Sequence, residues 1–353
     1  MPGVNQPIHV TPGAAAPRTP QAVTPMAFVQ AMCLALERQG LAPEPLLRQA
    51  QIAPPELDRP DARINALQME VFSGLAMRAL DDEALGWFER PLPWGSYGML
   101  ARASLSAPTL GVALRRWCRH HGLLTRDITL GVDTAEGTCR IVLTEHRPPG
   151  GDGRLREFCC VSVLRNFHGL ACWLVDSRIP LLGAAFAFAA PPHADVYPLL
   201  FDGPATFDAA ETALRFDARY LDLPLRRDEA AMNQMLSRAL AIQVRPYRRD
   251  RLLMQRVRQV LLAQPRQAHN AQDLATTLNT STRTLHRQLR DEGTTLQALK
   301  DSVRRELALA LLQRSSRPIK QVADAAGFQN EKSFIRAFKG WTGMTPGEWR
   351  GQA

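Results

Sequence analysis

The chain has 353 residues, a length that suits two domains, and its 45% hydrophobic content is too high for a disordered protein. Its 43 Lys and Arg residues against 34 Asp and Glu residues give a net charge of +9, which argues against basic partners. The charge is uneven, because residues 245–353 contain 20 basic and 9 acidic residues whereas residues 1–244 contain 23 and 25. A basic C-terminal third predicts contact with nucleic acid or a membrane surface.

The N-terminal residues 1–25 contain six prolines and one arginine, a composition that predicts a disordered tail and not a secretory signal. The longest apolar stretch, residues 181–190, is about half as long as a membrane span. All six cysteines lie within the first 172 residues, and none forms a C-x-x-C pair. We therefore expect reduced thiols, a cytoplasmic location associated with the nucleoid, and no membrane partner.

Residues 26–240 predict an α+β domain, because segments with helical apolar spacing alternate with short β-type runs. We expect one helix to begin at residues 106–109, with Pro108 in its first turn, and to continue through Trp117. The remaining expected helices cover residues 26–39, 67–80 and 155–175. The expected strands cover residues 127–132 and 138–144, which form a hairpin, and residues 181–189, 206–208 and 213–216.

A basic, proline-broken segment, residues 241–250, predicts a linker between two domains. Residues 251–352 beyond it have almost no β-type pattern and read as short amphipathic helices separated by Gly, Asn and Ser-Thr turns. The predicted fold is therefore multidomain α+β, with an all-α domain after the mixed one.

Two segments of the all-α domain, residues 273–289 and 321–338, resemble each other and have the features of helix-turn-helix units. Asn279 and Gly327 suit the left-handed conformation that ends a first helix. Ser281 and Asn330 are suited to cap the second helix. Small residues, Ala275 in one copy and Ala323 in the other, let the two helices of each unit cross closely. Apolar residues four apart anchor each second helix, and these are Leu285 and Leu289 in one copy and Phe334 and Phe338 in the other.

The free face of each second helix supplies the candidate DNA contacts. They are Arg283, Thr284, His286 and Arg287 in the first unit, at about 271–292, and Glu331, Lys332, Ser333 and Arg336 in the second, at about 319–342, where Ile335 shares the face. Arg287 and Arg336 occupy matching registers, which favours pairing with guanine in a groove. For Arg283 and Lys332, contact with phosphate and contact with a base are equally expected. His286 is equally expected to read a base or only to cover the helix surface.

A helix expected between the units, residues 295–313, keeps one face apolar and spans roughly 28 Å. One turn of B-DNA is about 34 Å, so a single chain has the length to place two recognition helices in successive major grooves.

Residues 251–352 resemble the DNA-binding domain of the AraC/XylS family of bacterial transcription regulators. The motifs that carry the resemblance are ADAAGFQ at 323–329, the Phe334–Phe338 pair, and TGMTPGEWR at 342–350. Arg304, Ala308 and Leu311 also fit the linker-helix pattern of the family. Leu289 and Asn279 depart from it, since the family often has Phe and Gly there.

The N-terminal half resembles the arabinose-binding-like domain of one AraC subgroup through residues 61–64, 98–100, 106–114 and 219–223. The resemblance implies a domain that senses a small molecule of unknown identity, forms a homodimer, or does both. It further implies promoter DNA as partner, contact with RNA polymerase, and activation of transcription, and it does not specify the effector-binding residues.

Candidate catalytic and metal-binding groups are weak in the N-terminal half. Cys118, His120 and His121 lack a further ligand at metal spacing, and Cys159 and Cys160 lie too far along one helix to meet His168. We therefore expect no catalytic residue, metal or cofactor. The alternatives are an enzyme fused to a DNA-binding domain and an architectural DNA binder without a ligand. The loop at residues 90–98 concentrates aromatic residues, and it suits either a pocket wall or a packed loop.

Overall fold

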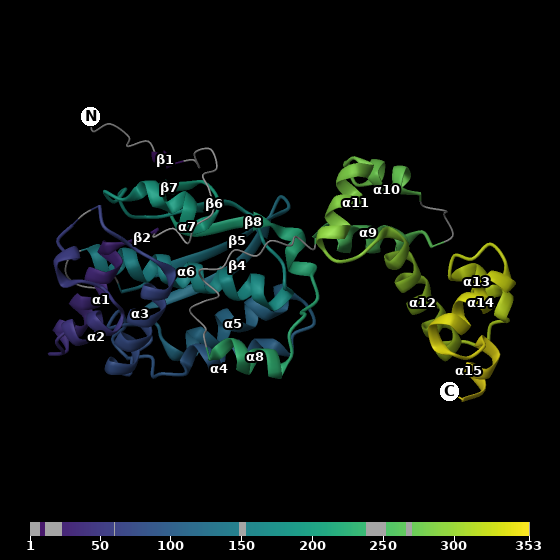
Figure 1. The fold of residues 1–353 in the computed structure, drawn as a ribbon, viewed down its shortest axis with the longest axis horizontal. Helices are drawn as coiled ribbons and strands as arrows, with labels where there is room; N and C mark the ends of the chain where they lie inside the picture. The colour runs from purple at the N-terminus through teal and green to yellow at the C-terminus, as the bar shows by residue number, and fades with distance from the viewer. Residues whose placement is uncertain are drawn as a thin grey trace. The chain divides into compact units, whose positions relative to one another are not determined.

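The computed structural model describes residues 8–10, 23–59, 61–147, 153–237, 252–265 and 270–352. It divides the chain into two compact units, residues 1–248 and 249–353. The first unit contains the sheet and the second is helical, so the predicted multidomain α+β fold is confirmed (Figure 1). Residues 241–250, the expected linker, lie outside the described residues.

The first unit is built on a six-stranded sheet with the order β1-β7-β6-β8-β5-β4. All neighbouring strands pair antiparallel except β6 and β7, which pair parallel. The expected hairpin is present, since Ile128 pairs with Glu145 and Ala135 with Thr138. The strands are β1 (Ile8–Val10), β4 (Ile128–Ala135), β5 (Thr138–Glu145), β6 (Leu181–Ala185), β7 (Ala205–Phe207) and β8 (Thr212–Asp217).

The expectation of a disordered tail over residues 1–25 is wrong at two places. Strand β1 pairs with β7 at the edge of the large sheet, and β2 (Thr24–Pro25) pairs with β3 (Arg63–Ile64). Backbone hydrogen bonds to a partner strand provide order that the local composition of a tail does not reveal. The other residues of this tail, except residue 23, lie outside the described residues.

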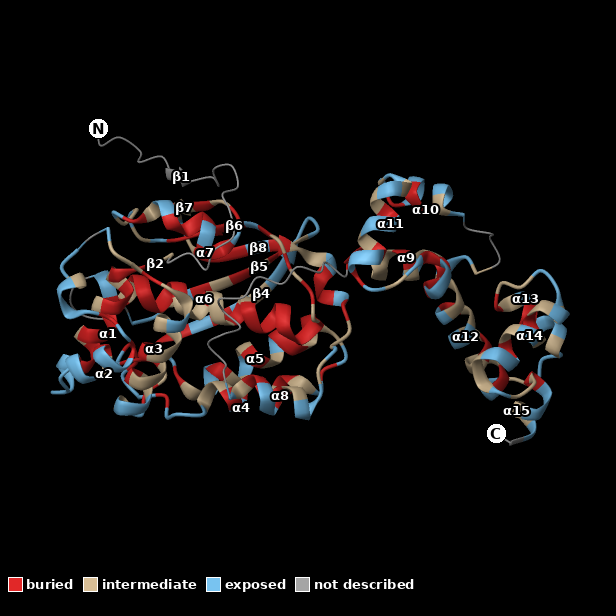
Figure 2. Cartoon of the chain, in the orientation of Figure 1, coloured by how far each residue is buried: buried red, intermediate tan, exposed pale blue. Residues whose placement is uncertain are grey.

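Helices pack against the sheet and bury the core of the first unit (Figure 2). Helix α5 packs on β4, α6 contacts β8, and α1 packs on α6. Helix α6 is long and apolar enough to cross a membrane, but 72% of its most apolar window is buried, as in the core helix of a globular unit. The helices are α1 (Met26–Arg38), α2 (Glu44–Gln49), α3 (Ala66–Leu80), α4 (Ser96–Leu105), α5 (Leu110–Leu124), α6 (Gly153–Val175), α7 (Tyr197–Phe201) and α8 (Glu229–Leu236).

The expected entry into α5 needs a correction. The helix begins at Leu110 after the extended N-cap residue Thr109, so Pro108 precedes the helix and does not lie in its first turn. Helices α2, α4, α7 and α8 were not expected. Helices α2 and α7 are six and five residues long, too short for apolar periodicity to distinguish them from turns.

The second unit contains seven helices within its described residues. Its first core lies among α9, α10, α11 and the start of α12, and its second among the end of α12, α13 and α14. The helices are α9 (Leu252–Ala263), α10 (Ala271–Thr277), α11 (Thr282–Asp291), α12 (Leu296–Arg314), α13 (Ile319–Ala325), α14 (Glu331–Thr342) and α15 (Pro346–Gln352). Helix α12 therefore joins two small helical bodies, each with its own apolar core.

Candidate nucleic-acid interface and internal cavity

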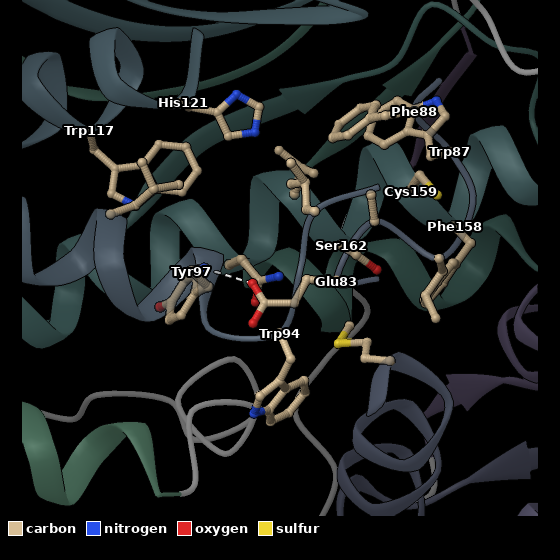
Figure 3. Close-up of a pocket in the computed structure, with 17 residues that line it drawn as sticks. Glu83, Trp87, Phe88, Trp94, Tyr97, Trp117, His121, Phe158, Cys159 and Ser162 are labelled. Atoms are coloured by element: carbon tan, nitrogen blue, oxygen red, sulfur yellow. Dashed lines mark hydrogen bonds between the residues drawn. The ribbon is translucent and has the colours of Figure 1, made fainter. Parts of the chain in front are cut away.

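A cavity lies inside the first unit, between α3, α4, α5, α6 and the loop that joins α3 to α4 (Figure 3). It has an empty volume of about 950 Å³, including its open mouth. The walls are largely aromatic, and the aromatic lining residues are Trp87, Phe88, Trp94, Tyr97, Trp117 and Phe158. A concave, mostly apolar lining with a few polar groups is typical of a small-molecule site.

Three consecutive acidic residues hold the loop that forms one wall of this cavity. The Asp82 carboxylate accepts hydrogen bonds from the backbone N–H groups of Ala84, Gly86 and Leu92, at 2.7 to 2.9 Å. Glu83 accepts from the N–H groups of Gly95 and Tyr97, and Asp81 from that of Trp94. The loop is thus shaped by side chain to backbone hydrogen bonds and not by secondary structure.

Replacing Asp82 by Asn is expected to lower the free energy of unfolding by about 1–3 kcal/mol, because an amide has one acceptor oxygen and no charge where three N–H groups need a carboxylate. Asp82 is buried, so water does not replace the lost acceptor. Urea unfolding of the full chain measures the change. Asp61→Asn, at an exposed carboxylate paired with Arg59, is the control and should change little. Equal losses in the two variants would contradict the role given to Asp82.

Two aromatic pairs line this cavity, and several of its lining residues carry buried polar atoms without a partner in the described part of the chain. Trp87 stacks on Phe88 at 5.0 Å between ring centroids, and Trp117 stacks on His121 at 5.1 Å. The Nε1 atoms of both tryptophans and Nδ1 of His121 are buried, with no hydrogen-bond partner within the described part of the chain. Buried polar atoms normally have partners, so these atoms indicate a site that a ligand or water completes.

His121 is neutral in the folded unit, because burial lowers its pKa from 6.5 to about 4. The unfolded chain binds a proton at this residue near pH 6.5, while the folded chain does so only near pH 4. Below pH 6.5 the unfolded state therefore binds more protons, and stability decreases as the pH falls from 6.5 to 4.

We expect this histidine to cost roughly 3 kcal/mol of stability between pH 6.5 and pH 4. The variant His121→Gln lacks the titrating group, so its stability should decline less over that range. Chemical unfolding of the full chain at a series of pH values gives both curves. Parallel curves for the two proteins would contradict the assignment.

Sequence reasoning found only part of this cavity. The 90–98 loop contributes Leu92, Trp94 and Tyr97 to the wall, which supports its interpretation as a pocket wall. The roles of Trp87, Trp117 and His121 were missed, since a buried aromatic residue on a helix usually belongs to the core. Burial raises the pKa of the Cys159 thiol well above its ordinary value, so this lining cysteine is an inert thiol. Among the described residues no group of three or more His, Cys, Asp or Glu is arranged to hold a metal ion.

The first helix-turn-helix of the second unit consists of α10 and α11. Asn279 ends the first helix with a φ of 51°, and the Ser281 hydroxyl accepts from the N–H of Thr284 at 3.1 Å to cap the second. Leu285 and Leu289 are fully buried, so α11 is anchored by the two residues that the sequence indicates.

The second helix-turn-helix, α13 and α14, repeats this arrangement with one more residue in its turn. Gly327 has a φ of 83°, and the Asn330 side chain accepts from the N–H of Ser333 at 2.8 Å. Phe334 and Phe338 are fully buried, and Trp341 and Trp349 pack against the same core, as expected.

The candidate DNA contacts separate into two groups. The side chains of Arg283, His286, Arg287, Lys332 and Arg336 are exposed, and none has a hydrogen bond or ion pair within the described residues. Thr284 and Ser333 are half-buried and supply the capped N–H groups. Glu331 is half-buried at the first turn of α14, and Ile335 packs partly on the core. The exposed group is therefore free to reach a groove.

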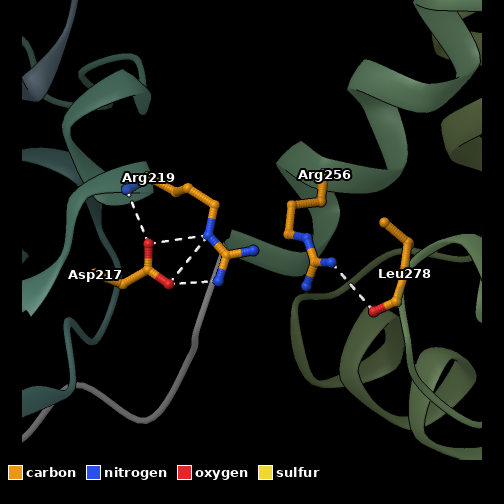
Figure 4. A network of polar contacts seen from close by, with 4 residues as sticks. All are labelled: Asp217, Arg219, Arg256 and Leu278. Atoms are coloured by element: carbon orange, nitrogen blue, oxygen red, sulfur yellow. Dashed lines mark hydrogen bonds and ion pairs between the residues drawn. The ribbon is translucent and has the colours of Figure 1, made fainter. Parts of the chain in front are cut away.

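The arginines of α9 are engaged inside the second unit. Arg256 donates to the backbone oxygen of Leu278 at 3.1 Å (Figure 4), and Arg258 pairs with Glu306. The Arg256 bond satisfies a carbonyl at the end of α10, so this arginine supports the first helix-turn-helix. Each of these two arginines is half-buried and has a partner within the unit. Arg248, Arg249 and Arg251 lie outside the described residues.

Comparison with known proteins gives two family matches. The model of the N-terminal arabinose-binding domain of AraC transcription regulators matches residues 40–225, and a helix-turn-helix domain model matches residues 274–352. The ornithine utilization regulator of Pseudomonas aeruginosa is 28% identical over 329 residues, which cover 93% of this chain and 96% of that protein. The transcriptional regulator VqsM of the same organism is 28% identical over 261 residues, which cover 72% of this chain and 79% of that protein.

Solved structures with similarity include the transcriptional regulator CdpR of Pseudomonas aeruginosa, at 21% identity and a TM-score of 0.34, covering 93% of this chain and 98% of that one. A DNA-binding dual regulator from Escherichia coli K-12 is 29% identical with a TM-score of 0.28, and covers 28% of this chain and 90% of that one.

Proposed function

This chain belongs to the AraC family of DNA-binding transcription regulators, and we propose that it reads two adjacent major-groove segments of promoter DNA through α11 and α14. Arg287 and Arg336 are the proposed base-reading residues, one for each segment. Arg283, His286 and Lys332 are proposed to contact phosphate or base edges beside them. Thr284, Glu331 and Ser333 belong to the same helix starts. The Thr284 and Ser333 hydroxyls are proposed to approach the DNA backbone, and the Glu331 carboxylate, which phosphate repels, is proposed to face a base edge that donates to it.

One observation carries this proposal, namely the matching registers of Arg287 and Arg336. Each lies two residues after the first buried anchor of its helix, Leu285 or Phe334, and each is exposed. Because the anchors fix the rotation of each helix on its core, the two arginines project from equivalent positions. An arginine guanidinium pairs bidentately with guanine O6 and N7, which is the commonest specific contact in the major groove.

The DNA site is tested by selecting bound sequences from random DNA with the full chain and then footprinting the selected site. We expect two protected segments, about 10 base pairs apart from centre to centre, on one face of the helix. Affinity should fall steeply with salt, because contacts to phosphate release counterions. A single protected segment, or selection of no sequence, would contradict the proposal.

The first unit is proposed to be the sensing and dimerising part, covering residues 26–240, with residues 241–250 as linker and residues 251–352 as DNA-binding domain. The cavity lined by Trp87, Trp117 and His121 is its proposed effector site. Effector binding would shift the population between states that differ in their contacts with DNA or RNA polymerase. We further propose a homodimer that activates transcription in the cytoplasm, at the nucleoid.

Ligand sensing without catalysis is tested by adding metabolite mixtures to the full chain. A thermal shift with unchanged metabolite composition supports a sensor, and conversion of a metabolite into product would support the fused-enzyme alternative. Sedimentation of the full chain tests the homodimer, with a monomer at micromolar concentration as the contrary result.

A further inference from the structure

We propose that the cavity of the first unit takes an uncharged, ring-containing molecule that carries both a hydrogen-bond acceptor and a donor. This inference rests on the proposed function, since it identifies the chemical class of the effector. Three features of the lining carry it: its charge, its unpartnered polar atoms, and its flat aromatic faces.

The lining provides no counter-charge for an anionic ligand. Among its residues there is no lysine or arginine, and Arg165 lines an adjoining cavity, where it has interactions of its own. Burial of a carboxylate or phosphate without a partner is unfavourable, so acids and phosphorylated molecules do not fit.

A cationic ligand also lacks a free partner. Glu83 is the one acidic lining residue, and its two carboxylate oxygens already accept the N–H groups of Gly95 and Tyr97 at 2.7 and 2.6 Å. Burial raises the pKa of Glu83 and so weakens its tendency to ionise. His121, buried in the same wall, is uncharged at neutral pH. An α-amino acid, which carries both charges, therefore has no partner for either one.

The unpartnered polar atoms specify what the ligand carries. Trp87 and Trp117 are each 5% exposed, and their indole N–H groups have no acceptor within the described residues. Both nitrogens are closed off from the cavity in this structure, so they pair with an acceptor such as a carbonyl or ether oxygen only when the rings shift to admit it. Asn166 Oδ1, which is buried and also without a partner in the described ranges, requires a donor such as a hydroxyl or amide N–H.

The aromatic pairs in the cavity wall favour a ligand that contains a flat ring. The Trp87–Phe88 and Trp117–His121 pairs stand at the cavity wall with their rings nearly parallel, at 23° and 19° (Figure 3). Ring faces of this kind favour offset stacking or edge contacts with another ring. At the mouth, Trp94 is 46% exposed and the Arg78 guanidinium lies 4.7 Å above its ring, so the charge of Arg78 is directed at the indole face.

The backbone of the loop is strained where it meets the cavity. Leu85 is buried at a φ of 52°, a conformation that a bulky residue rarely adopts, and the Asp82 hydrogen bonds on either side impose it. Strain of this kind is retained in functional sites, where the surrounding structure determines the conformation.

The test uses calorimetric titration of the full chain with phenylacetamide, phenylacetate and phenylalanine, which share a ring and differ in charge. We expect phenylacetamide to bind at least about tenfold tighter than either charged probe. The proposal is overturned if a charged probe binds as tightly, or if phenylacetamide shows no binding at millimolar concentration.

A matched pair of variants tests the indole donor. Trp117→Phe keeps an aromatic ring but removes the N–H together with the five-membered ring of the indole, and should weaken phenylacetamide about fivefold more than it weakens ethylbenzene. Trp341→Phe makes the same change in the second unit, outside the cavity, and should leave both affinities unchanged. Trp87→Phe replaces Trp117→Phe if that variant does not fold. An equal loss for phenylacetamide and ethylbenzene would overturn the role of the donor.

The ligand class and the proposed regulator can fail separately. If phenylacetamide does not bind but the full chain selects a DNA site, the ligand class is wrong and the DNA-binding proposal stands. If no DNA site is selected, the regulator proposal is wrong whatever the titration shows.

Discussion

Replacing Gly327 by alanine is expected to abolish the second helix-turn-helix. A Cβ at this residue would lie 2.1 Å from the backbone oxygen of Pro265, and the residue has a φ of 83°, which disfavours side chains. The left-handed conformation alone costs about 1–2 kcal/mol. The overlap adds more, because a backbone oxygen does not move aside as the end of a flexible side chain does.

The neighbourhood of Gly327 explains why this residue determines the packing of the second unit. Pro265 follows α9, which belongs to the first core, whereas Gly327 lies in the turn of the second helix-turn-helix. The Arg304 guanidinium of α12 stands 5.1 Å from the Phe328 ring beside it. The close approach at Gly327 therefore joins the end of the first helical body to the second.

Gly343→Ala is the matched control for this prediction. Gly343 also has a positive φ, 79°, but a Cβ there meets nothing within 4 Å. The Gly343→Ala substitution should lower the free energy of unfolding only by the cost of the left-handed conformation, about 1–2 kcal/mol. Amide hydrogen exchange in α13 and α14 of the full chain measures both variants. Equal loss of protection in the two would show that the contact with Pro265 has no effect.

Removing both proposed base readers, Arg287→Ala with Arg336→Ala, is expected to reduce specific DNA affinity by about 2–6 kcal/mol, the sum of two losses of about 1–3 kcal/mol each. Both side chains are exposed, so the folded state should keep its stability. Non-specific affinity should fall much less, because each substitution removes only one positive charge from a domain held to phosphate by many.

A gel-shift competition between the selected site and unrelated DNA measures this difference. Arg305→Ala with Arg314→Ala is the charge-matched control, since both residues are exposed on α12 and lie outside both recognition helices. It should weaken binding to both DNAs alike. Equal losses on both DNAs for the double variant of Arg287 and Arg336 would remove the base-reading role and leave general electrostatic attraction.

The second unit is the part of the fold that the sequence predicts well, because its structure depends on local chemistry. Asn279 and Gly327 end helices in the left-handed conformation, and Ser281 and Asn330 cap the next ones, as their residue types indicate. Buried residues four apart orient each recognition helix. Signals within about ten residues of each other were therefore sufficient.

The first unit is less predictable because its site is assembled from distant segments. Asp82 holds its loop through N–H groups up to ten residues away, and Trp117 and Asn166 meet at the cavity from two separate helices. No sequence spacing reports that an indole N–H lacks a partner, since this depends on the packing of every neighbour. The pairing of β1 with β7 joins residues about 200 positions apart and escaped prediction for the same reason.

The most direct test of the two-segment account is to map the sequence preference of Arg287→Ala and Arg336→Ala separately, by repeating the selection from random DNA with each variant. We predict that each variant loses preference in one segment only, that the two segments differ, and that their centres lie about 10 base pairs apart. Loss of preference at the same base pairs in both variants, or unchanged preference in either, would contradict the account.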